Sequence, residues 1–176
     1  MLVNLKEILA PAYEKHYAVG SFNCYSYETF RGCIAAGEEM GAPVIAAFGA
    51  AYLANMSLET AHAIAASLAR EADVPVCLHL DHCSEVDVIC RAIKAGFGSV
   101  MYDGSMLPFA ENVANTHAVC HVAHACGVSV EAELGSLGVG VDSHEGRAED
   151  VEQYTDPEAA RDFIAATEVD ALAVSI

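Results

Sequence analysis

Short apolar segments rich in β-forming residues alternate with helix-length segments along the whole chain. In the helix-length segments, apolar residues recur every three or four positions, which is typical of amphipathic helices that cover a core. In the short segments the apolar residues run almost without interruption, as they do in strands that are buried on both faces. We predict a first helix at residues 4–15 and six strands, at residues 18–23, 43–48, 75–80, 99–102, 129–134 and 171–176.

Two of the helix-length segments carry boundary signals. Residues 84–87 resemble a capping box, and Gly96 is placed to end the helix that follows. Asp156 and Pro157 are typical of an N-cap followed by the first helical position. In the segment that ends at Gly96, the residues predicted to form the apolar face are Val86, Ile89, Cys90 and Ile93.

The regular alternation of strands and helices predicts an α/β fold whose parallel strands are joined by helical crossovers. No low-complexity or proline-rich linker interrupts the sequence, so we expect a single domain over residues 1–176. Two architectures fit: an open doubly wound sheet, or part of a (β/α)₈ TIM barrel, which needs about 250 residues when complete. The length of 176 residues by itself favours the open sheet.

The charge balance is strongly acidic, with 8 Lys and Arg residues against 25 Asp and Glu residues and a formal net charge of -17. Such a charge repels phosphate backbones and anionic membrane surfaces, so we expect neither nucleic acid nor a membrane as a partner. The hydrophobic content of 54% excludes a disordered polymer. An anionic ligand would therefore need a metal ion, backbone N–H groups or a few placed cations.

Neither the first ten residues nor any later stretch has the pattern of a secretory signal or a membrane span. The seven cysteines form an odd set without a C-x-x-C pair and lie mostly in apolar segments. We expect a cytoplasmic protein with reduced thiols, most of them buried as small hydrophobic side chains.

Polar side chains stand where several predicted strands end. Asp81 and His82 follow the third strand, and Asp103 follows the fourth. In both architectures the carboxyl ends of parallel strands meet the ligand. One such Asp could equally cap the next helix, but several polar ends together favour a divalent cation, which offsets repulsion among the acids. Further candidates are Glu131 and Glu133, which share one face of the fifth strand, and Asn23 at the end of the first.

A second set of potential ligands lies on one helix-length segment. His117, His121 and His124 recur at i, i+4 and i+7, a spacing that could hold a metal ion. We favour a solvent-exposed polar stripe, because the opposite face of this helix would be apolar, with Ala118, Val122 and Cys126. Three interpretations of Cys83 are open: a further metal ligand, a redox-sensitive thiol or an ordinary loop cysteine. We favour the loop cysteine.

Three ordered motifs carry a resemblance to a known family: residues 79–82 (HLDH), 99–105 (SVMYDGS) and 129–135 (SVEAELG). With them, the chain resembles the class II, metal-dependent ketose-bisphosphate aldolases, which include the fructose-1,6-bisphosphate and tagatose-1,6-bisphosphate enzymes. The likeness runs from Gly20 to Ile176. It implies about the first six β/α units of a (β/α)₈ barrel and overrides the expectation from length. It also implies a chain truncated after the sixth barrel strand, with one of three expected zinc-ligand histidines.

The resemblance implies roles for individual residues. His82 would be a zinc ligand, and Asp81 would be the acid/base that exchanges a proton with the aldehyde-derived hydroxyl. Asp103 and Glu133 would belong to a site for a second, divalent or monovalent, cation, and Asn23 would contact the substrate. Class I aldolases instead need a Schiff-base lysine, and the lysines here all fall in helical segments: Lys6, Lys15 and Lys94.

The reaction implied by the family is cleavage of fructose or tagatose 1,6-bisphosphate to dihydroxyacetone phosphate and glyceraldehyde 3-phosphate through a metal-stabilised enediolate. The resemblance therefore implies zinc as the catalytic cofactor and a sugar bisphosphate as the substrate. It further implies a cytoplasmic homo-oligomer of glycolysis or related carbohydrate metabolism. The 176-residue chain alone is expected to be inactive.

Two positions depart from the family pattern. Gly49 stands where Ser or Thr is usual after the second strand, so a hydroxyl contact with the substrate is missing. In the loop at residues 135–142, the acid of the family is either represented by Asp142 or lost at Val141.

A non-catalytic hypothesis stays open beside the aldolase. It is an α/β binding module of flavodoxin-like or receiver-like type, or a decayed aldolase relative without activity. A sheet with strand order 2-1-3-4-5 would indicate the module. A curled barrel sheet with His82 and the acidic residues at one mouth would favour the enzyme.

Overall fold

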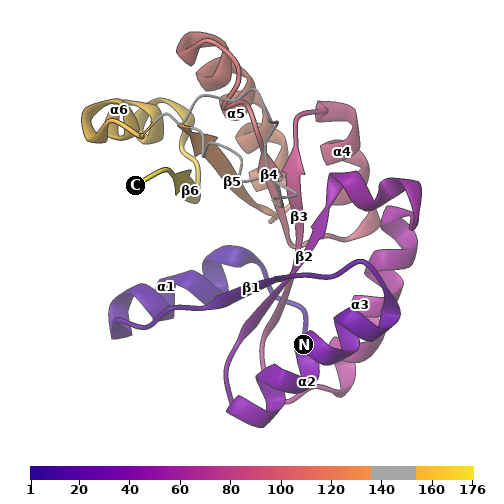
Figure 1. Cartoon of the computed structure of the whole chain (residues 1–176). Helices are drawn as coiled ribbons and strands as arrows, with labels where there is room; N and C mark the ends of the chain where they lie inside the picture. The colour runs from indigo at the N-terminus through magenta and orange to yellow at the C-terminus, as the bar shows by residue number, and fades with distance from the viewer. Residues whose placement is uncertain (136–153) are drawn as a thin grey trace.

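The computed structural model describes residues 1–135 and 154–176. Its centre is one sheet of six parallel strands in the order β1-β2-β3-β4-β5-β6, so each strand pairs with its neighbour in sequence. The sheet curls, and the helices that join its strands lie on the outer side (Figure 1). The strands are β1 (Gly20–Asn23), β2 (Val44–Gly49), β3 (Val76–Cys83), β4 (Ser99–Tyr102), β5 (Ser129–Leu134) and β6 (Ala171–Val174). The helices are α1 (Leu5–Lys15), α2 (Tyr27–Met40), the short 3₁₀ helix η1 (Ala50–Ala54), α3 (Leu58–Glu71), α4 (Val86–Ala95), α5 (Phe109–Ala125) and α6 (Pro157–Thr167).

The strand order decides between the two architectures. A doubly wound sheet reverses its direction at a switch point and would place β1 inside the sheet. Here β1 and β6 are the outer strands and the order never reverses. The architecture is therefore that of the first six β/α units of a TIM barrel, as the resemblance implied, and the open sheet favoured by length alone is wrong.

The main hydrophobic core lies between the outer face of the sheet and the helices. Along β3, Leu78 and Leu80 are fully buried in it, because alternate side chains of a strand point to the same face. The intervening side chains face the inside of the curl, where the polar residues of β3, β4 and β5 gather. The helices contribute Phe30 and Ile34 from α2, Ala61 and Ala65 from α3, Ile89 from α4, Val119 from α5 and Phe163 from α6.

Helix α1 packs against the inner face of the sheet near the starts of the strands. Leu5 and Ile8 form a second, smaller core with Ile45 of β2 and Cys77 of β3. All four side chains are at most 6% exposed. The amino-terminal end of the inner face is thus apolar and covered, which leaves the carboxyl-terminal end for polar chemistry.

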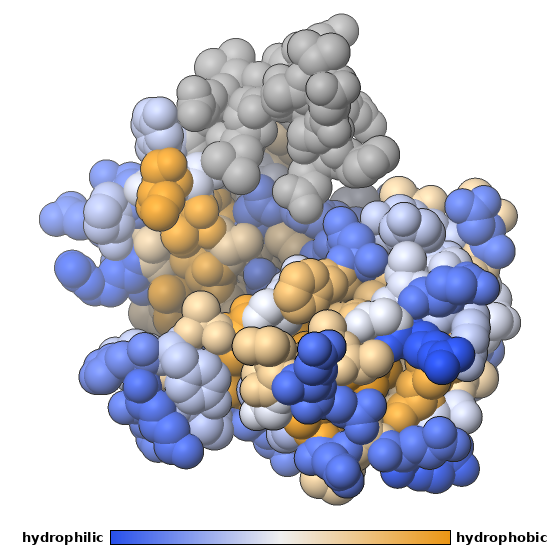
Figure 2. All heavy atoms as spheres, turned by 60° about the horizontal axis from the view of Figure 1, so that its bottom comes forward, coloured by the Kyte–Doolittle hydropathy of each residue, from blue (hydrophilic) through white to orange (hydrophobic). Residues whose placement is uncertain are grey.

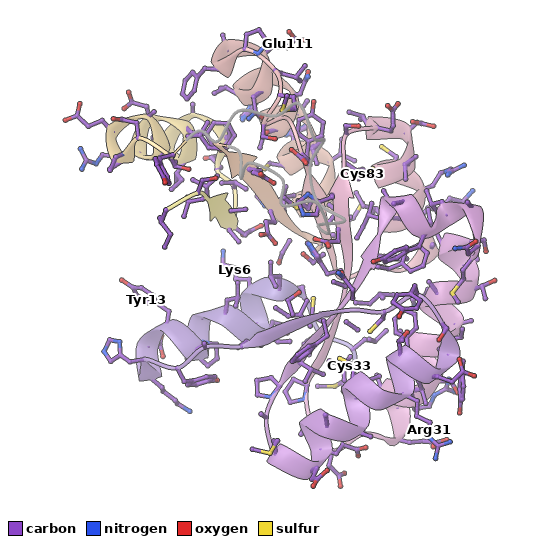
Figure 3. All side chains as sticks on the ribbon, in the orientation of Figure 1. Lys6, Tyr13, Arg31, Cys33, Cys83 and Glu111 are labelled. Atoms are coloured by element: carbon purple, nitrogen blue, oxygen red, sulfur yellow. The ribbon has the colours of Figure 1, made fainter. Side chains whose placement is uncertain are left out.

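Asp170, directly before β6, ties together α1, β5 and α5. Its carboxylate accepts a hydrogen bond from the Val130 backbone N–H at 2.9 Å and lies 2.8 Å from His124 Nε2. Lys6 Nζ is 3.6 Å from the other carboxylate oxygen, and the Lys6 side chain leaves α1 on the side of β5 and β6 (Figure 3). Because the Asp170 side chain is only 9% exposed, these contacts satisfy a buried charge.

The predicted polar stripe on α5 is confirmed, since His117, His121 and His124 are exposed. Its predicted apolar counterpart is wrong: Ala118, Val122 and Cys126 are exposed as well. The face of α5 that packs on the sheet instead carries Asn112, Thr116, Val119, Cys120 and Ala123. Two of these buried residues are polar, and Thr116 donates a hydrogen bond to Asn112. Because they interrupt the apolar pattern, hydrophobic periodicity did not identify this face as the buried one.

Strand β3 differs most from its predicted bounds, because it continues through residue 83. Cys83 is therefore not a loop cysteine. It is 1% exposed in the main core, and its thiol donates to the Glu85 carbonyl at 3.5 Å. Burial raises the pKa of this thiol, so it is suited to packing rather than to ligation.

The boundary signals of the helices are confirmed in part. Gly96 ends α4 with a left-handed φ of 104°, and Asp156 caps α6 by accepting two backbone N–H groups. The predicted capping box at residues 84–87 does not form, because Glu85 is the N-cap and its side chain makes no capping hydrogen bond. Two residues of the predicted apolar face are exposed, Val86 and Cys90.

None of the seven cysteines forms a disulfide. Four of them are buried, as expected for small hydrophobic side chains: Cys24, Cys77, Cys83 and Cys120. Within the described ranges, no helix combines the length and hydrophobicity needed to cross a membrane.

The two outer strands each have one unpaired edge within the described part of the chain, since β1 pairs with β2 and β6 pairs with β5. Phe22 of β1 and Val174 of β6 are 52% and 47% exposed. On the face shown in Figure 2, apolar residues reach the surface between groups of polar ones. Such edges favour association with further strands.

Candidate active site

A β-bulge near the end of β3 positions Asp81 and His82. From Leu80 to Cys83, β3 advances by three residues while β4 advances by two. His82 takes a φ of 45°, a left-handed conformation that is costly for a residue other than glycine. Without the bulge, adjacent side chains would point to opposite faces of the sheet. With it, both side chains reach residues of the inner face.

His82 meets two carboxylates from neighbouring strands. Its Nδ1 lies 3.2 Å from Asp103 Oδ2, directly after β4, and 3.7 Å from Glu133 Oε2 on β5. One potential ligand atom from each of the three residues lies within 4.8 Å of the other two. We call His82, Asp103 and Glu133 the His82 cluster. It brings together the three residues for which the resemblance implied metal ligation.

The electrostatics of the cluster favour positive charge. The hydrogen bond to Asp103 is the largest cause that raises the pKa of His82 to about 9. Burial acts in the opposite direction, and the charges of Asp81, Glu133 and Asp103 raise the pKa further. Burial alone would raise the pKa of Asp103, but hydrogen bonds from His82 and Ser105 lower it. Ser105 donates from both its backbone N–H, at 3.1 Å, and its hydroxyl, at 2.7 Å. In the metal-free cluster, the raised pKa of His82 and the lowered pKa of Asp103 therefore both favour an ion pair between these two side chains.

Asp81 lies beside the cluster and next to a second group of polar side chains on the inner face, formed by His79, Ser99 and Glu131. Its Oδ1 is 3.7 Å from Nε2 of the buried His79, two residues earlier on the same face of β3. Burial would raise the pKa of Asp81, but the nearby rings of His79 and His82 outweigh burial and lower it. Asp81 is therefore ionised at neutral pH and able to accept a proton.

Three other predicted positions lie apart from this cluster or outside the described residues. Asn23 ends β1, is exposed, and is separated from β3 by β2. Gly49 pairs with Asp81 across β2 and β3, and a Cβ at this glycine would come within 3.2 Å of the Tyr52 ring. A larger residue would have to displace that ring. Asp142, the predicted loop acid, is outside the described residues.

Comparison with known proteins decides the family. The sequence profile described as "Fructose-bisphosphate aldolase class-II" matches residues 3–176. The chain belongs to this family. It is 43% identical over 178 residues to the fructose-bisphosphate aldolase of Thermus caldophilus, covering 100% of this chain and 57% of that relative.

Two further aldolases show the same extent of similarity. The D-tagatose-1,6-bisphosphate aldolase subunit GatY of Klebsiella oxytoca is 39% identical over 175 residues, with 99% of this chain and 61% of the relative covered. The crystal structure of the YdjI aldolase from Escherichia coli K12 superposes with a TM-score of 0.87 at 36% identity, covering 100% of this chain and 61% of that one. The chain thus spans about three fifths of the length of these relatives.

Class II aldolases depend on a metal ion, and the His82 cluster has suitable donors for one. An imidazole nitrogen with two carboxylate oxygens is a ligand set that zinc and similar divalent cations accept. The two carboxylates lie 3.2 Å and 3.7 Å from His82 Nδ1, and the same contacts that raise the pKa of His82 would favour a bound cation.

The inner face also carries polar residues beneath Asp81 that the sequence did not predict as part of the site. The side chains of His79 and Ser99 hydrogen-bond to each other there at 2.8 Å. Glu131 approaches the same histidine at 3.5 Å. The period-two spacing that pointed to Glu131 and Glu133 could also have identified His79, because His79 precedes Asp81 by two residues.

Proposed function

We propose that the protein containing this chain cleaves a ketose 1,6-bisphosphate, that of fructose or tagatose, to dihydroxyacetone phosphate and glyceraldehyde 3-phosphate. One observation carries the proposal: Asp81 lies beside the His82 cluster at the carboxyl ends of β3 to β5, in a chain of the class II aldolase family. The names of the relatives in Thermus caldophilus and Klebsiella oxytoca support these two substrates.

Asp81 would move the proton of the reaction. In cleavage, its carboxylate takes the proton from the substrate hydroxyl that becomes the aldehyde, while the adjacent carbon–carbon bond breaks. In condensation it returns that proton to the aldehyde oxygen. The lowered pKa of Asp81 supports this assignment, because the base must be ionised before cleavage begins.

His82 would be the zinc ligand contributed by β3, with Asp103 and Glu133 beside it for a second, divalent or monovalent, cation. The contact between His82 and Asp103 would orient the imidazole, as carboxylates next to metal-bound histidines commonly do. A divalent ion held there would supply Lewis-acid chemistry at the ketone oxygen of the substrate. Asn23, at the carboxyl end of β1, would contact the substrate.

The same proposal includes a homo-oligomeric assembly and a cytoplasmic location. Measured on residues 1–176 alone, aldol cleavage is expected to be undetectable. The reason is that His82 would supply only one of the three histidine ligands that the resemblance implies for the catalytic zinc.

The test is a coupled triose-phosphate assay on the zinc-loaded full-length protein, with fructose and tagatose 1,6-bisphosphates supplied separately. We expect cleavage of at least one of the two substrates, and its loss after chelation and in Asp81→Asn. A protein that holds zinc through His82 but cleaves neither substrate would contradict the proposal.

A further inference from the structure

His79 is a buried polar side chain on the inner face of β3. It is 2% exposed, and its Nδ1 lies 2.8 Å from the Ser99 hydroxyl of β4. Among the residues that the structure describes, its buried Nε2 has no hydrogen-bond partner. Buried polar atoms in folded proteins are nearly always paired, so an unpaired ring nitrogen next to a site indicates a functional constraint.

The unpaired nitrogen points between two carboxylates. Asp81 Oδ1 is 3.7 Å away and Glu131 Oε2 is 3.5 Å away. Both carboxylates are partly buried, with 20% and 26% of their side chains exposed. Either oxygen would reach hydrogen-bonding distance after a shift of a few tenths of an ångström.

The chemistry of the four groups fixes where a ring hydrogen must be. Carboxylate oxygens accept hydrogen bonds, and the two nearest to Nε2 belong to Asp81 and Glu131, so this geometry assigns a hydrogen to Nε2. The Ser99 hydroxyl can donate to Nδ1 when the ring is neutral, or accept from it when the ring is charged. In both cases the donor aimed at Asp81 and Glu131 is Nε2–H.

We propose that His79 is the positioning residue for Asp81: held by Ser99, it presents Nε2–H to the Asp81 carboxylate and shares it with Glu131. The inference rests on the proposed role of Asp81 as the acid/base. Asp81 needs such support because it sits on a bulge, next to a residue in a strained backbone conformation. Glu131 keeps the imidazole in place when Asp81 turns toward a substrate hydroxyl.

The first arm of the test measures turnover of the full-length, zinc-loaded protein with the ketose bisphosphate that the wild type cleaves. His79→Leu removes the donor, and His79→Gln keeps an N–H near the place of Nε2. We expect kcat to fall about 10- to 100-fold in His79→Leu, with KM within about twofold and unchanged zinc content. His79→Gln should recover part of the loss.

Met101→Leu is the matched packing control, because Met101 is also 2% exposed and lies on the inner-face side of β4. It should leave kcat within about twofold of the wild type. Equal losses in Met101→Leu and His79→Leu, or a loss of zinc in parallel with activity, would reduce His79 to a structural residue and overturn the inference.

The second arm is nitrogen NMR of the full-length protein labelled with ¹⁵N-histidine, which needs no activity. We expect a protonated Nε2 whose shift responds to Asp81→Asn as well as to Glu131→Gln, and an Nδ1 signal that moves in Ser99→Ala. A bare Nε2, or one insensitive to Asp81→Asn, overturns the inference. If the wild type cleaves no substrate, the proposed function fails, and this arm alone still decides whether His79 holds Asp81.

Discussion

The Nδ1 atom of His82 and the Oδ2 atom of Asp103 lie 3.2 Å apart, although 21 residues separate them in the sequence. The contact joins the end of β3 to the end of β4, and it depends on the bulge that turns His82 inward. It is also the largest cause of the raised pKa of His82. The contact therefore connects backbone geometry, charge and proposed metal binding in one place.

Metal binding should depend on every member of the His82 cluster. We expect the full-length protein to bind zinc, His82→Ala to lose it, and Asp103→Asn to weaken it about 10- to 100-fold. Zinc per chain is measured by elemental analysis after dialysis against a weak chelator. His121→Ala, on the exposed face of α5, controls for adventitious binding. Unchanged zinc in His82→Ala would remove this residue from the site.

Asp81→Asn separates proton transfer from metal binding. The amide keeps the shape of the side chain but cannot take up the proton, so kcat should fall about 10²- to 10⁴-fold. Zinc content should stay near that of the wild type. Proton exchange on dihydroxyacetone phosphate, which does not need the hydroxyl-directed acid, should suffer less than cleavage. An empty metal site, or unchanged cleavage, would show that the assigned role is wrong.

The stability of the metal-free chain should fall as the pH rises. The pKa of His82 is about 9 in the folded state, above its ordinary value of 6.5, so the folded state binds this proton more tightly. The resulting stabilisation is complete below pH 6.5 and disappears as the pH rises through 9. Urea unfolding at several pH values measures it, and His82→Gln should flatten the slope in this window. His117→Gln, an exposed histidine of α5, should not.

Asp170→Asn should destabilise the fold. The substitution removes the charge that pairs with Lys6 and His124, and it leaves one fewer acceptor for the Val130 N–H. A loss of about 1–3 kcal/mol in the free energy of unfolding is expected, visible as a lower Tm. Lys6→Met should cost less than about 1 kcal/mol, because 73% of the lysine side chain is exposed. Equal effects of the two substitutions would contradict the buried role of Asp170.

The unpaired edges of β1 and β6 should make residues 1–176 associate when they are produced alone. Light scattering should show species larger than a monomer, increasing with concentration. Val174→Lys, on the exposed side of β6, should reduce the association. A monomer that unfolds cooperatively at all concentrations would count against this expectation.

The sequence by itself determined the alternation of strands and helices and the parallel class of the sheet. The bounds of β4 and β5 and the caps at Gly96 and Asp156 could be predicted, because they depend on local propensity and hydrogen bonding within a few residues. The motifs around Asp81 also indicated the family. These features can be predicted from the sequence because the residues that determine them lie close together along the chain.

Only the tertiary structure decided the curl of the sheet, the bulge at the end of β3 and the layer that contains His79. The length of the chain favoured an open sheet, and this prediction was wrong. A count of residues carries no information on the order of the strands. The bulge turns the side chain of His82 toward the inner face of the sheet. No residue type in this segment predicts a bulge. The pairing of His79 with Ser99 and its approach to Glu131 cross three strands, so they follow from register, which packing against the helices sets.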